Sequence, residues 1–266
     1  MRSIAALLRY DFLTQTSYRI STVIMLASFL LIVVPVYFIG HSLQGTMAEA
    51  IRNQGDQYFG FLVVGLVAQR VLWAAMVSLP NTLQSGIRTG TLEAFFATPV
   101  GTPTLVTGLM TYKTLWGLFE GCLLLGTGWL LGARIEADHL LVSLLLILLI
   151  TIVHIPFGLL ASAGILAFRT SGPMVMAAYG ASVFLGGVYY PTHVIPSWME
   201  GLSAFVPLTY GLRALRRTLM EGLPIGAVMN DVLILVGFIV LLGIASVILF
   251  RRALLYARQS GSLAQY

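Results

Sequence analysis

Long apolar runs, separated by short polar connections, constrain this chain more than any other feature of its sequence. A helix that crosses the hydrocarbon core of a bilayer needs about 20 mostly apolar residues. Six runs reach or approach this length, with expected bounds Ser21–Gly40, Tyr58–Leu79, Thr104–Leu131, Leu140–Phe168, Met174–Tyr190 and Val232–Phe250. The first two spans therefore occupy residues 21–79, the next three residues 104–190, and the last residues 232–250. Only 9% of the residues are charged, against about 25% in a soluble domain, so we expect an all-α, polytopic membrane protein with a single membrane domain over residues 1–266.

The distribution of basic residues predicts how these spans are oriented. Six spans place both termini on one side of the membrane, and basic residues are enriched in cytoplasmic segments. The side of the termini carries eight arginines, which are Arg2, Arg9, Arg19, Arg88, Arg169, Arg251, Arg252 and Arg258. The other side carries five, which are Arg52, Arg134, Arg213, Arg216 and Arg217. We therefore expect both termini and the loop after the second span to face the cytoplasm. The net charge of +5 is thus a topology signal, and no clustered basic run indicates nucleic-acid binding.

The sequence lacks the patterns of an enzymatic site. It contains no Gly-x-x-x-x-Gly-Lys-Ser/Thr phosphate loop, because no glycine-rich loop precedes its one lysine, Lys113. Its one cysteine, Cys122, excludes a disulfide within the chain. The four histidines are scattered and form no pattern of metal ligands: His41, His139, His154 and His193. We therefore expect no catalytic residue, no metal and no cofactor in this chain.

A polar interruption after the second span predicts a short helix over residues 85–98. Thr89 or Thr91 can cap its N-terminus, and Glu93 lies in the first turn, where a negative charge suits the helix dipole. One apolar face of this helix is formed by Leu92, Phe95 and Phe96. Because the loop is expected in the cytoplasm, this face could contact a soluble partner. The alternative is a helix that only rests on lipid headgroups.

Three further segments lie outside the spans. Residues 2–19 have the amphipathic pattern of a helix that lies in the membrane interface. Residues 193–217 predict two short helices, the second starting at Pro207, that dip into the outer interface. Irregular backbone at membrane depth must be covered, so we expect these helices to pack on the bundle. Residues 251–266 are expected to form a cytoplasmic tail.

Two ionisable residues lie inside the spans, where charges are costly and therefore informative. Arg70 in the second span and Glu120 in the third lie at similar depth on consecutive antiparallel helices. They are expected either to form an ion pair that fixes the register of the helices, or to line a polar translocation path. His154, near Pro156, is expected to be a buried, hydrogen-bonded histidine rather than a proton relay.

The third span carries glycines at positions that allow close approach of another helix. These are Gly117, Gly121, Gly128 and Gly132, and two of the pairs have Gly-x-x-x-Gly spacing. The stripe predicts either a contact within the chain or a dimer seam.

Three motifs together carry a resemblance to a known family. The first is Arg88-Thr89-Gly90-Thr91-Leu92-Glu93 with Thr98-Pro99-Val100. The second runs from Pro191 through Ile195-Pro196-Ser197-Trp198 and then from Pro207 to Arg216. The third is Phe250-Arg251-Arg252-Ala253-Leu254. With these motifs the chain resembles, over most of its length, the permease subunit of type-2 ABC transporters, also called type V ABC exporters.

The resemblance implies a single transmembrane permease domain in a prokaryotic inner membrane, with both termini cytoplasmic and no ATP site of its own. Its partners would be a dimeric cytoplasmic ABC ATPase, which binds Mg-ATP, and a second permease chain, identical or different. Residues 85–98 would be the coupling helix, which contacts the ATPase through Arg88, Thr91, Leu92, Glu93, Phe95 and Phe96. Residues 2–19 would be the connecting helix at the inner interface. Residues 193–217 would be re-entrant helices of an outer gate formed by Trp198, Pro207, Tyr210 and Arg213.

For the function, the resemblance implies export powered by the separate ATPase. The apolar spans, with few charges and 11 tyrosines, favour an amphipathic drug-like or lipid-like substrate. Export of a polysaccharide or other glycoconjugate by the same mechanism is an alternative. A second alternative is an ion-coupled secondary transporter that uses Arg70, Glu120 and His154, although no inverted repeat is evident.

Overall fold

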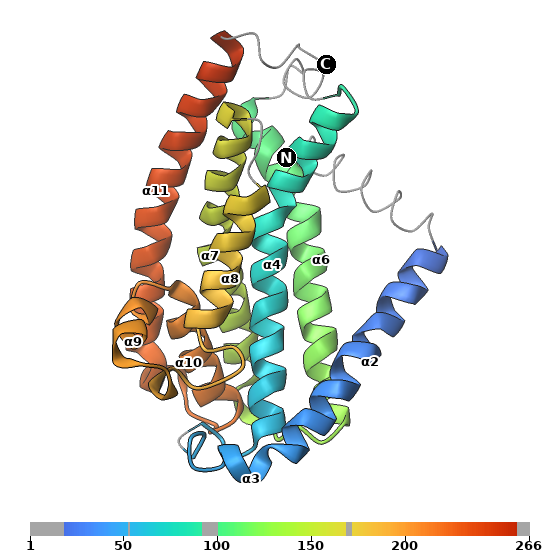
Figure 1. Cartoon of the computed structure of the whole chain (residues 1–266), viewed down its shortest axis with the longest axis vertical. Helices are drawn as coiled ribbons and strands as arrows, with labels where there is room; N and C mark the ends of the chain where they lie inside the picture. Colours follow the sequence, from blue (N-terminus) through green and yellow to red (C-terminus); the bar gives the residue numbers. More distant parts are fainter. Residues whose placement is uncertain (1–18, 53, 92–100, 169–171, 260–266) are drawn as a thin grey trace.

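The computed structural model describes residues 19–52, 54–91, 101–168 and 172–259, and the regular structure within these ranges is helical. The long helices are α2 (Arg19–Ser42), α4 (Tyr58–Arg88), α6 (Thr102–Leu130), α7 (Leu140–Phe168) and α11 (Met229–Gln259) (Figure 1). The shorter helices are α3 (Gln44–Met47), α8 (Gly172–Leu185), α9 (Ser197–Ser203) and α10 (Pro207–Leu219), with 3-10 turns η1 (Ala137–His139), η2 (Thr192–Val194) and η3 (Ile225–Val228). The predicted helix at residues 2–19 lies outside the described residues except for Arg19, and so do residues 92–98 of the helix predicted at 85–98.

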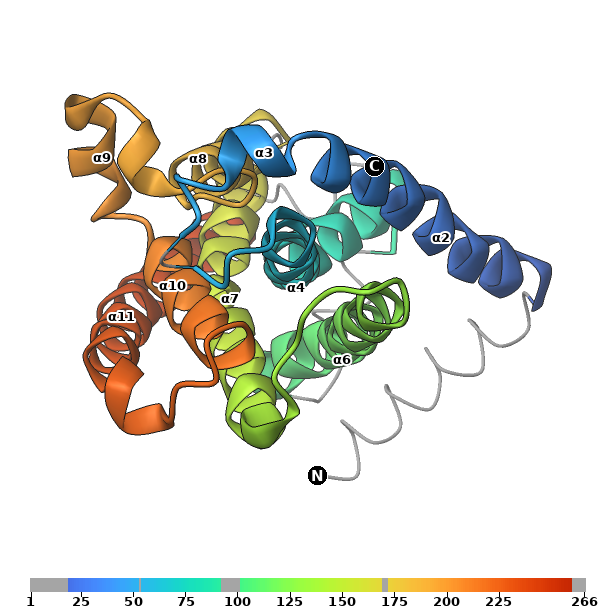
Figure 2. The ribbon, with the colours of Figure 1, turned by 90° about the horizontal axis from the view of Figure 1, so that it is seen from below.

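Helix α4 lies at the centre of the bundle, between α6 and α7 (Figure 2). Its apolar 18-residue stretch is 78% buried by protein, whereas the corresponding stretch of α11 is only 11% buried. A helix that is apolar on all sides must be surrounded either by protein or by lipid. Protein therefore surrounds α4, while α11 packs one side on α7 and presents the rest of its apolar surface outward.

Three helical segments of the described chain are long and apolar enough to cross a membrane: Tyr58–Arg88, Leu140–Phe168 and Ile225–Gln259. Helix α6 is as long as α7, with 29 residues each, but is less apolar. Helix α8 has only 14 residues, which at 1.5 Å per residue is about 21 Å, short of the hydrocarbon core of about 30 Å. The chain is thus a bundle of long apolar helices completed by shorter ones.

The glycine stripe of α6 forms a contact within the chain. A Cβ atom on Gly117 would overlap Ala74, one on Gly128 would overlap Val63, and one on Gly121 would lie 2.9 Å from Cγ1 of Val71. All three neighbours belong to α4, so the glycines allow α6 to lie directly against it. The fourth glycine, Gly132, follows the end of α6 and adopts a φ of +95°.

The predicted end of the second span at Leu79, with a loop from Pro80, is wrong, because α4 continues to Arg88. Proline removes one backbone hydrogen bond, but the helix beyond it is held by Leu79 and Leu83, which are buried in an apolar cluster with α6, α7 and α11. The helix ends at Arg88, and the chain turns away at Gly90, which has a φ of +67°. The amide of Gly90 donates to the carbonyl of Ile87, and that of Thr91 to the carbonyl of Gly86, as in a Schellman motif. Thr91 therefore takes part in the C-terminal cap of α4 rather than in an N-cap, and residues 85–88 are the last turn of α4 rather than the start of a separate helix.

Two other bounds also differ from the prediction. Helix α8 ends at Leu185 rather than at Tyr190, because Gly187 turns the chain with a φ of +77°. Helix α11 continues through the start of the predicted tail to Gln259, because Leu254 and Ala257 are buried. The bounds of α7 are those predicted for the fourth span.

The two ends of the bundle differ in structure. The connections of residues 43–52, 54–57, 131–139 and 186–228, with α9 and α10, lie at one end, which we call the α10 end (Figure 1). The C-terminal ends of α4 and α11 lie at the opposite end. Helix α10 packs on α7, α11 and α4, whereas α9 contacts mainly α8 and η2 among the described elements and is mostly exposed.

Candidate functional site

A partly open cavity of about 460 Å³ lies between α2, α4, α6 and α8. We call it the central cavity, and it is lined by Ser28, Ile32, Leu66, Gln69, Arg70, Trp73, Leu124, Met176, Tyr179 and Tyr189. Helix α2 approaches α4 near the α10 end, where Tyr37 packs edge-on against Phe59, and diverges from it toward the other end (Figure 1). The cavity occupies the space opened by this divergence, and its wall mixes apolar, aromatic and hydrogen-bonding side chains.

Arg70 and Glu120 form an ion pair at the edge of the central cavity. Nε of Arg70 donates to Oε2 of Glu120 at 2.6 Å, and Nε1 of Trp116 donates to Oε1 at 2.9 Å. Glu120 is 1% exposed, whereas 35% of the Arg70 side chain is exposed. The carboxylate is thus fully engaged inside the protein, while part of the guanidinium group faces the cavity. The pair joins α4 to α6, as expected of an ion pair that fixes helix register, and Arg70 also lines the cavity.

A chain of neutral hydrogen bonds crosses the cavity wall beside this pair. Nε2 of Gln69 donates to the hydroxyl of Tyr179 at 2.8 Å, and the hydroxyl of Tyr189 donates to Oε1 of Gln69 at 2.9 Å. The ring of Trp73 packs edge-on against Tyr179, with centroids 4.8 Å apart. Sequence analysis missed these residues. The polar pair Gln69-Arg70 inside an apolar span was a signal for the first, but nothing local distinguishes Tyr179 or Tyr189 from other tyrosines.

A second cavity, of about 290 Å³, shares Arg70 and Trp73 with the central cavity. Its polar wall includes Tyr112, Lys113 and Trp116 of α6, and Nζ of Lys113 donates to the hydroxyl of Thr82 at 2.7 Å. Arg70 therefore lies between two spaces along the contact of α4 and α6.

His154 is separate from this group of residues. It is fully buried in α7, its Nδ1 lies 2.7 Å from the carbonyl of Ile150, and it does not line the central cavity. It thus has the environment expected of a buried, hydrogen-bonded histidine.

The four residues predicted for an outer gate lie at the α10 end. Pro207 begins α10 and is buried, and the hydroxyl of Tyr210 donates to the carbonyl of Ala204 at 3.0 Å. Nε of Arg213 donates to both carboxylate oxygens of Asp231 in α11, at 3.0 and 3.1 Å. This hydrogen bonding raises the pKa of Arg213. These three residues hold α10 against its neighbours, whereas Trp198 of α9 is 68% exposed.

Arg216 was counted in the sequence only as one of the outer basic residues, yet it is 3% exposed. Its Nη1 donates to the carbonyl of Gly187 at 2.9 Å, and its Nη2 to those of Val188 at 3.0 Å and Phe61 at 3.3 Å. Its guanidinium carbon lies 3.4 Å from the centre of the Phe61 ring. The signal for its burial was its spacing, because it follows the buried Leu212 by one helical turn.

The residues predicted to contact an ATPase are described only in part. Arg88 and Thr91 are exposed at the end of α4. Leu92, Glu93, Phe95 and Phe96 lie outside the described residues. Within the described residues, no group of three side chains could hold a metal ion.

Comparison with known proteins identifies one family. The profile of the ABC-2 type transporter family matches residues 2–220. No curated protein matches the chain.

Proposed function

The chain belongs to the ABC-2 type transporter family, and from this premise we propose that its central cavity forms part of a path for an amphipathic, drug-like or lipid-like substrate. Members of this family are multi-pass membrane permease subunits that lack an ATP-binding site and work with ATPase subunits. The chain is therefore a permease subunit, and ATP hydrolysis belongs to a partner.

The observation that carries the proposal is the size and lining of the central cavity. Its volume of about 460 Å³ lies within the range of about 300–1,000 Å³ for sites that hold small molecules. Such a volume suits a drug-sized molecule or part of one lipid better than a hydrated glycan chain. The wall offers Trp73 and two tyrosines for an aromatic or acyl portion, and Gln69 for a polar one.

The charges in the wall support the same substrate class. Glu120 neutralises Arg70, so the cavity carries no bare charge that an apolar molecule would have to desolvate. The exposed part of the Arg70 side chain adds a polar surface to this wall.

The proposal includes an architecture that extends the observed bundle. The spans are α2, α4, α6, α7, α8 and α11, with both termini in the cytoplasm, and the α10 end faces outward. Helices α9 and α10 form the re-entrant outer gate, and a second permease chain, identical or different, completes the path. Residues 88–98 include the contact with the ATPase. Cross-linking from position 96 to the ATPase tests this contact, and its failure in an active complex would refute it.

Replacing Trp73 tests the role of the cavity. The chain is reconstituted with its ATPase in proteoliposomes, with fluorescent rhodamine 6G and a fluorescently labelled phospholipid as probes. We expect Trp73→Ala to slow transport of at least one probe about tenfold, because a large aromatic surface leaves the site. Trp129→Ala is the matched control, since Trp129 is 60% exposed on α6 and does not line the cavity. Equal transport by both variants would contradict the proposal.

A further inference from the structure

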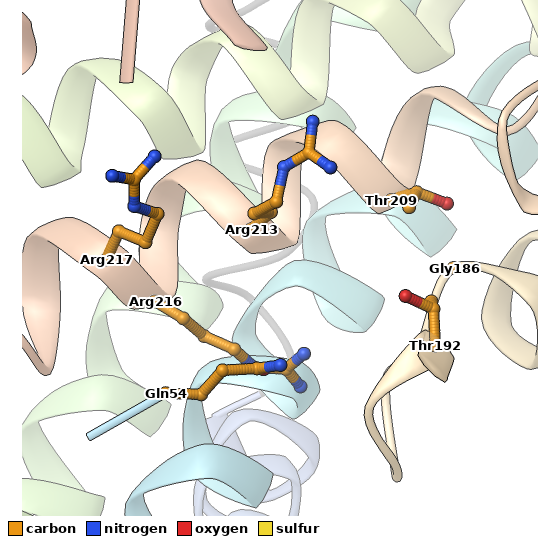
Figure 3. A pocket seen from close by; sticks show the side chains of 7 residues that line it. All are labelled: Gln54, Gly186, Thr192, Thr209, Arg213, Arg216 and Arg217. Carbon is orange, nitrogen blue, oxygen red and sulfur yellow. The ribbon is translucent and has the colours of Figure 1, made fainter. Parts of the chain in front are cut away.

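Another polar cavity, separate from the two cavities beside Arg70, lies at the α10 end. Its volume is about 250 Å³. We call it the arginine pocket, and its lining residues are Gln54, Gly186, Thr192, Thr209, Arg213, Arg216 and Arg217 (Figure 3). The three arginines all project from α10, and the lining residues include no carboxylate. This composition makes the pocket a concentration of positive charge in a mostly apolar protein.

Arg216 is the buried charge of this pocket. Its hydrogen bonds reach only carbonyl oxygens, and its Nε has no hydrogen-bond partner among the described residues. Carbonyl dipoles and the face of an aromatic ring stabilise a cation, but they do not neutralise it. Gly65 makes this arrangement possible, because a Cβ there would overlap the carbonyl of Val188. A buried charge without a counter-ion is costly, so an anion in the adjoining space would be favoured.

The other two arginines are only partly offset. Arg213 is paired with Asp231, although 53% of its side chain is exposed. Nη1 of Arg217 donates to the carbonyl of Ala227 at 3.0 Å. The acidic neighbour of Arg217 is Glu221, one turn further along the chain, and burial raises the pKa of this carboxyl group, opposed by the charge of Arg217. The pocket and its immediate acidic neighbours therefore retain an excess of positive charge, contributed by Arg216.

The arrangement of the donors suits a tetrahedral anion. Arg213 and Arg217 are one helical turn apart, and their guanidinium groups point to the same side of α10 in Figure 3. Two guanidinium groups so placed can hold one multivalent oxyanion between them. In Figure 3 Gln54 lies beside the end of the Arg216 side chain, on the other side of α10 from these two groups, and Thr192 adds a hydroxyl group to the lining.

We propose that the arginine pocket binds a phosphate group, supplied either by the headgroup of an anionic phospholipid or by a soluble phosphate. The neighbouring helix α9 exposes Trp198 and Leu202, and Phe205 directly after it is 78% exposed. A short helix with exposed aromatic side chains belongs at the level of the lipid headgroups. This places the pocket at a depth that both sources can reach.

The test uses the full-length permease chain, purified without its ATPase so that nucleotide sites cannot bind phosphate. In phosphatidylcholine nanodiscs, inorganic phosphate is titrated at constant ionic strength and the unfolding midpoint is followed. In a second arm, phosphatidylglycerol is added and native mass spectrometry counts the lipids retained. We expect a saturable response in at least one arm, weakened about tenfold by Arg217→Gln, which removes a charge-assisted hydrogen bond. The exposed Arg52 lies at the same end but does not line the pocket, so Arg52→Gln should change the response less than about twofold.

Each outcome either supports or contradicts the phosphate site, or identifies the source of the phosphate group. A response to phosphatidylglycerol alone supports a lipid headgroup, and a response to inorganic phosphate supports a soluble ligand. If Arg217→Gln does not fold, Arg217→Lys and Arg52→Lys replace the pair, and a smaller loss confined to Arg217→Lys supports the site. No saturable response in either arm, or equal losses for the two positions, would overturn it.

Discussion

Arg70 and Arg216 are both arginines within an apolar bundle, but the protein stabilises them in opposite ways. Arg70 lies along the contact of α4 and α6, keeps about a third of its side chain exposed, and is paired with a buried carboxylate. Arg216 lies at the α10 end, is almost fully buried, and donates to carbonyl groups beside an aromatic ring, with no carboxylate paired to it among the described residues. The comparison shows that charge is cancelled where the proposed substrate path runs, and is retained at the end of the bundle.

This difference has an electrostatic consequence. The Arg70–Glu120 pair has no net charge, so its field falls off quickly and its main effects are local hydrogen bonds and helix register. Burial lowers the pKa of Arg216 to about 9, opposed by the field of Tyr58, and the residue therefore remains a cation at neutral pH. Arg70 therefore makes the central cavity more polar without adding net charge, whereas Arg216 gives the arginine pocket a positive electrostatic potential.

The largest expected effect comes from removing Arg216. Arg216→Met deletes the donors to three buried carbonyl groups and should lower the free energy of unfolding by about 4 kcal/mol. Arg216→Lys keeps the charge with fewer donors and should recover less than half of this loss. Unfolding in mixed micelles measures both, with the exposed Arg52→Met as control. A loss below about 1 kcal/mol for Arg216→Met would mean that these hydrogen bonds are not structural.

Glu120→Gln should have an intermediate effect. The variant keeps the shape of the side chain and an acceptor for Trp116, but leaves Arg70 without its carboxylate. Because Arg70 is partly exposed, water offsets part of the loss, and we expect about 2 kcal/mol in the free energy of unfolding. The double variant Arg70→Gln/Glu120→Gln should be more stable than Glu120→Gln alone. If the double variant is destabilised relative to the unsubstituted protein by the sum of the losses measured for Arg70→Gln and Glu120→Gln, the two side chains are not coupled.

The smallest expected effect is that of Asp231→Asn, which makes Arg213 resemble Arg216 by removing its carboxylate. Arg213 is about half exposed, so the free energy of unfolding should fall by less than about 1 kcal/mol. The positive charge of the arginine pocket rises, and affinity for inorganic phosphate should increase about fivefold. A phosphate titration of both proteins checks this, and an unchanged or lower affinity would argue against electrostatic binding there.

Local patterns in the sequence predicted that the long helices exist, and they predicted the ion pair as one of two possibilities. The bounds of α7 follow from its apolar run, and the partnership of Arg70 and Glu120 follows from equal depth on neighbouring helices. The end of α4 was missed because Pro80 is the stronger stop signal locally, whereas burial of Leu79 and Leu83 in a cluster of distant residues carries the helix past it. Gly90 then ends it, which a local pattern could have indicated.

The remaining site residues depend on contacts that no local pattern records. Gln69 and Tyr179 are separated by 110 positions, and Arg216 and Phe61 by 155. Tyrosine and glutamine are ordinary residues in these segments until the fold brings them together. The spacing of Arg216 from Leu212 indicates the buried face of α10, but the carbonyl groups of Gly187 and Val188 that accept its hydrogen bonds are brought there only by the fold.

The uninterrupted length of α4 has a mechanical consequence. Its 31 residues form a rod of about 46 Å that begins beside the carbonyl group that holds Arg216 and ends beside the segment proposed to meet the ATPase. A rod of hydrogen-bonded turns resists stretching, so a push at Arg88 must reach Phe61 as a tilt or a slide. Because the glycines of α6 let it pack closely against α4, the two helices would move together. A displacement of α4 at the proposed ATPase contact would then change the width of the opening at the α10 end.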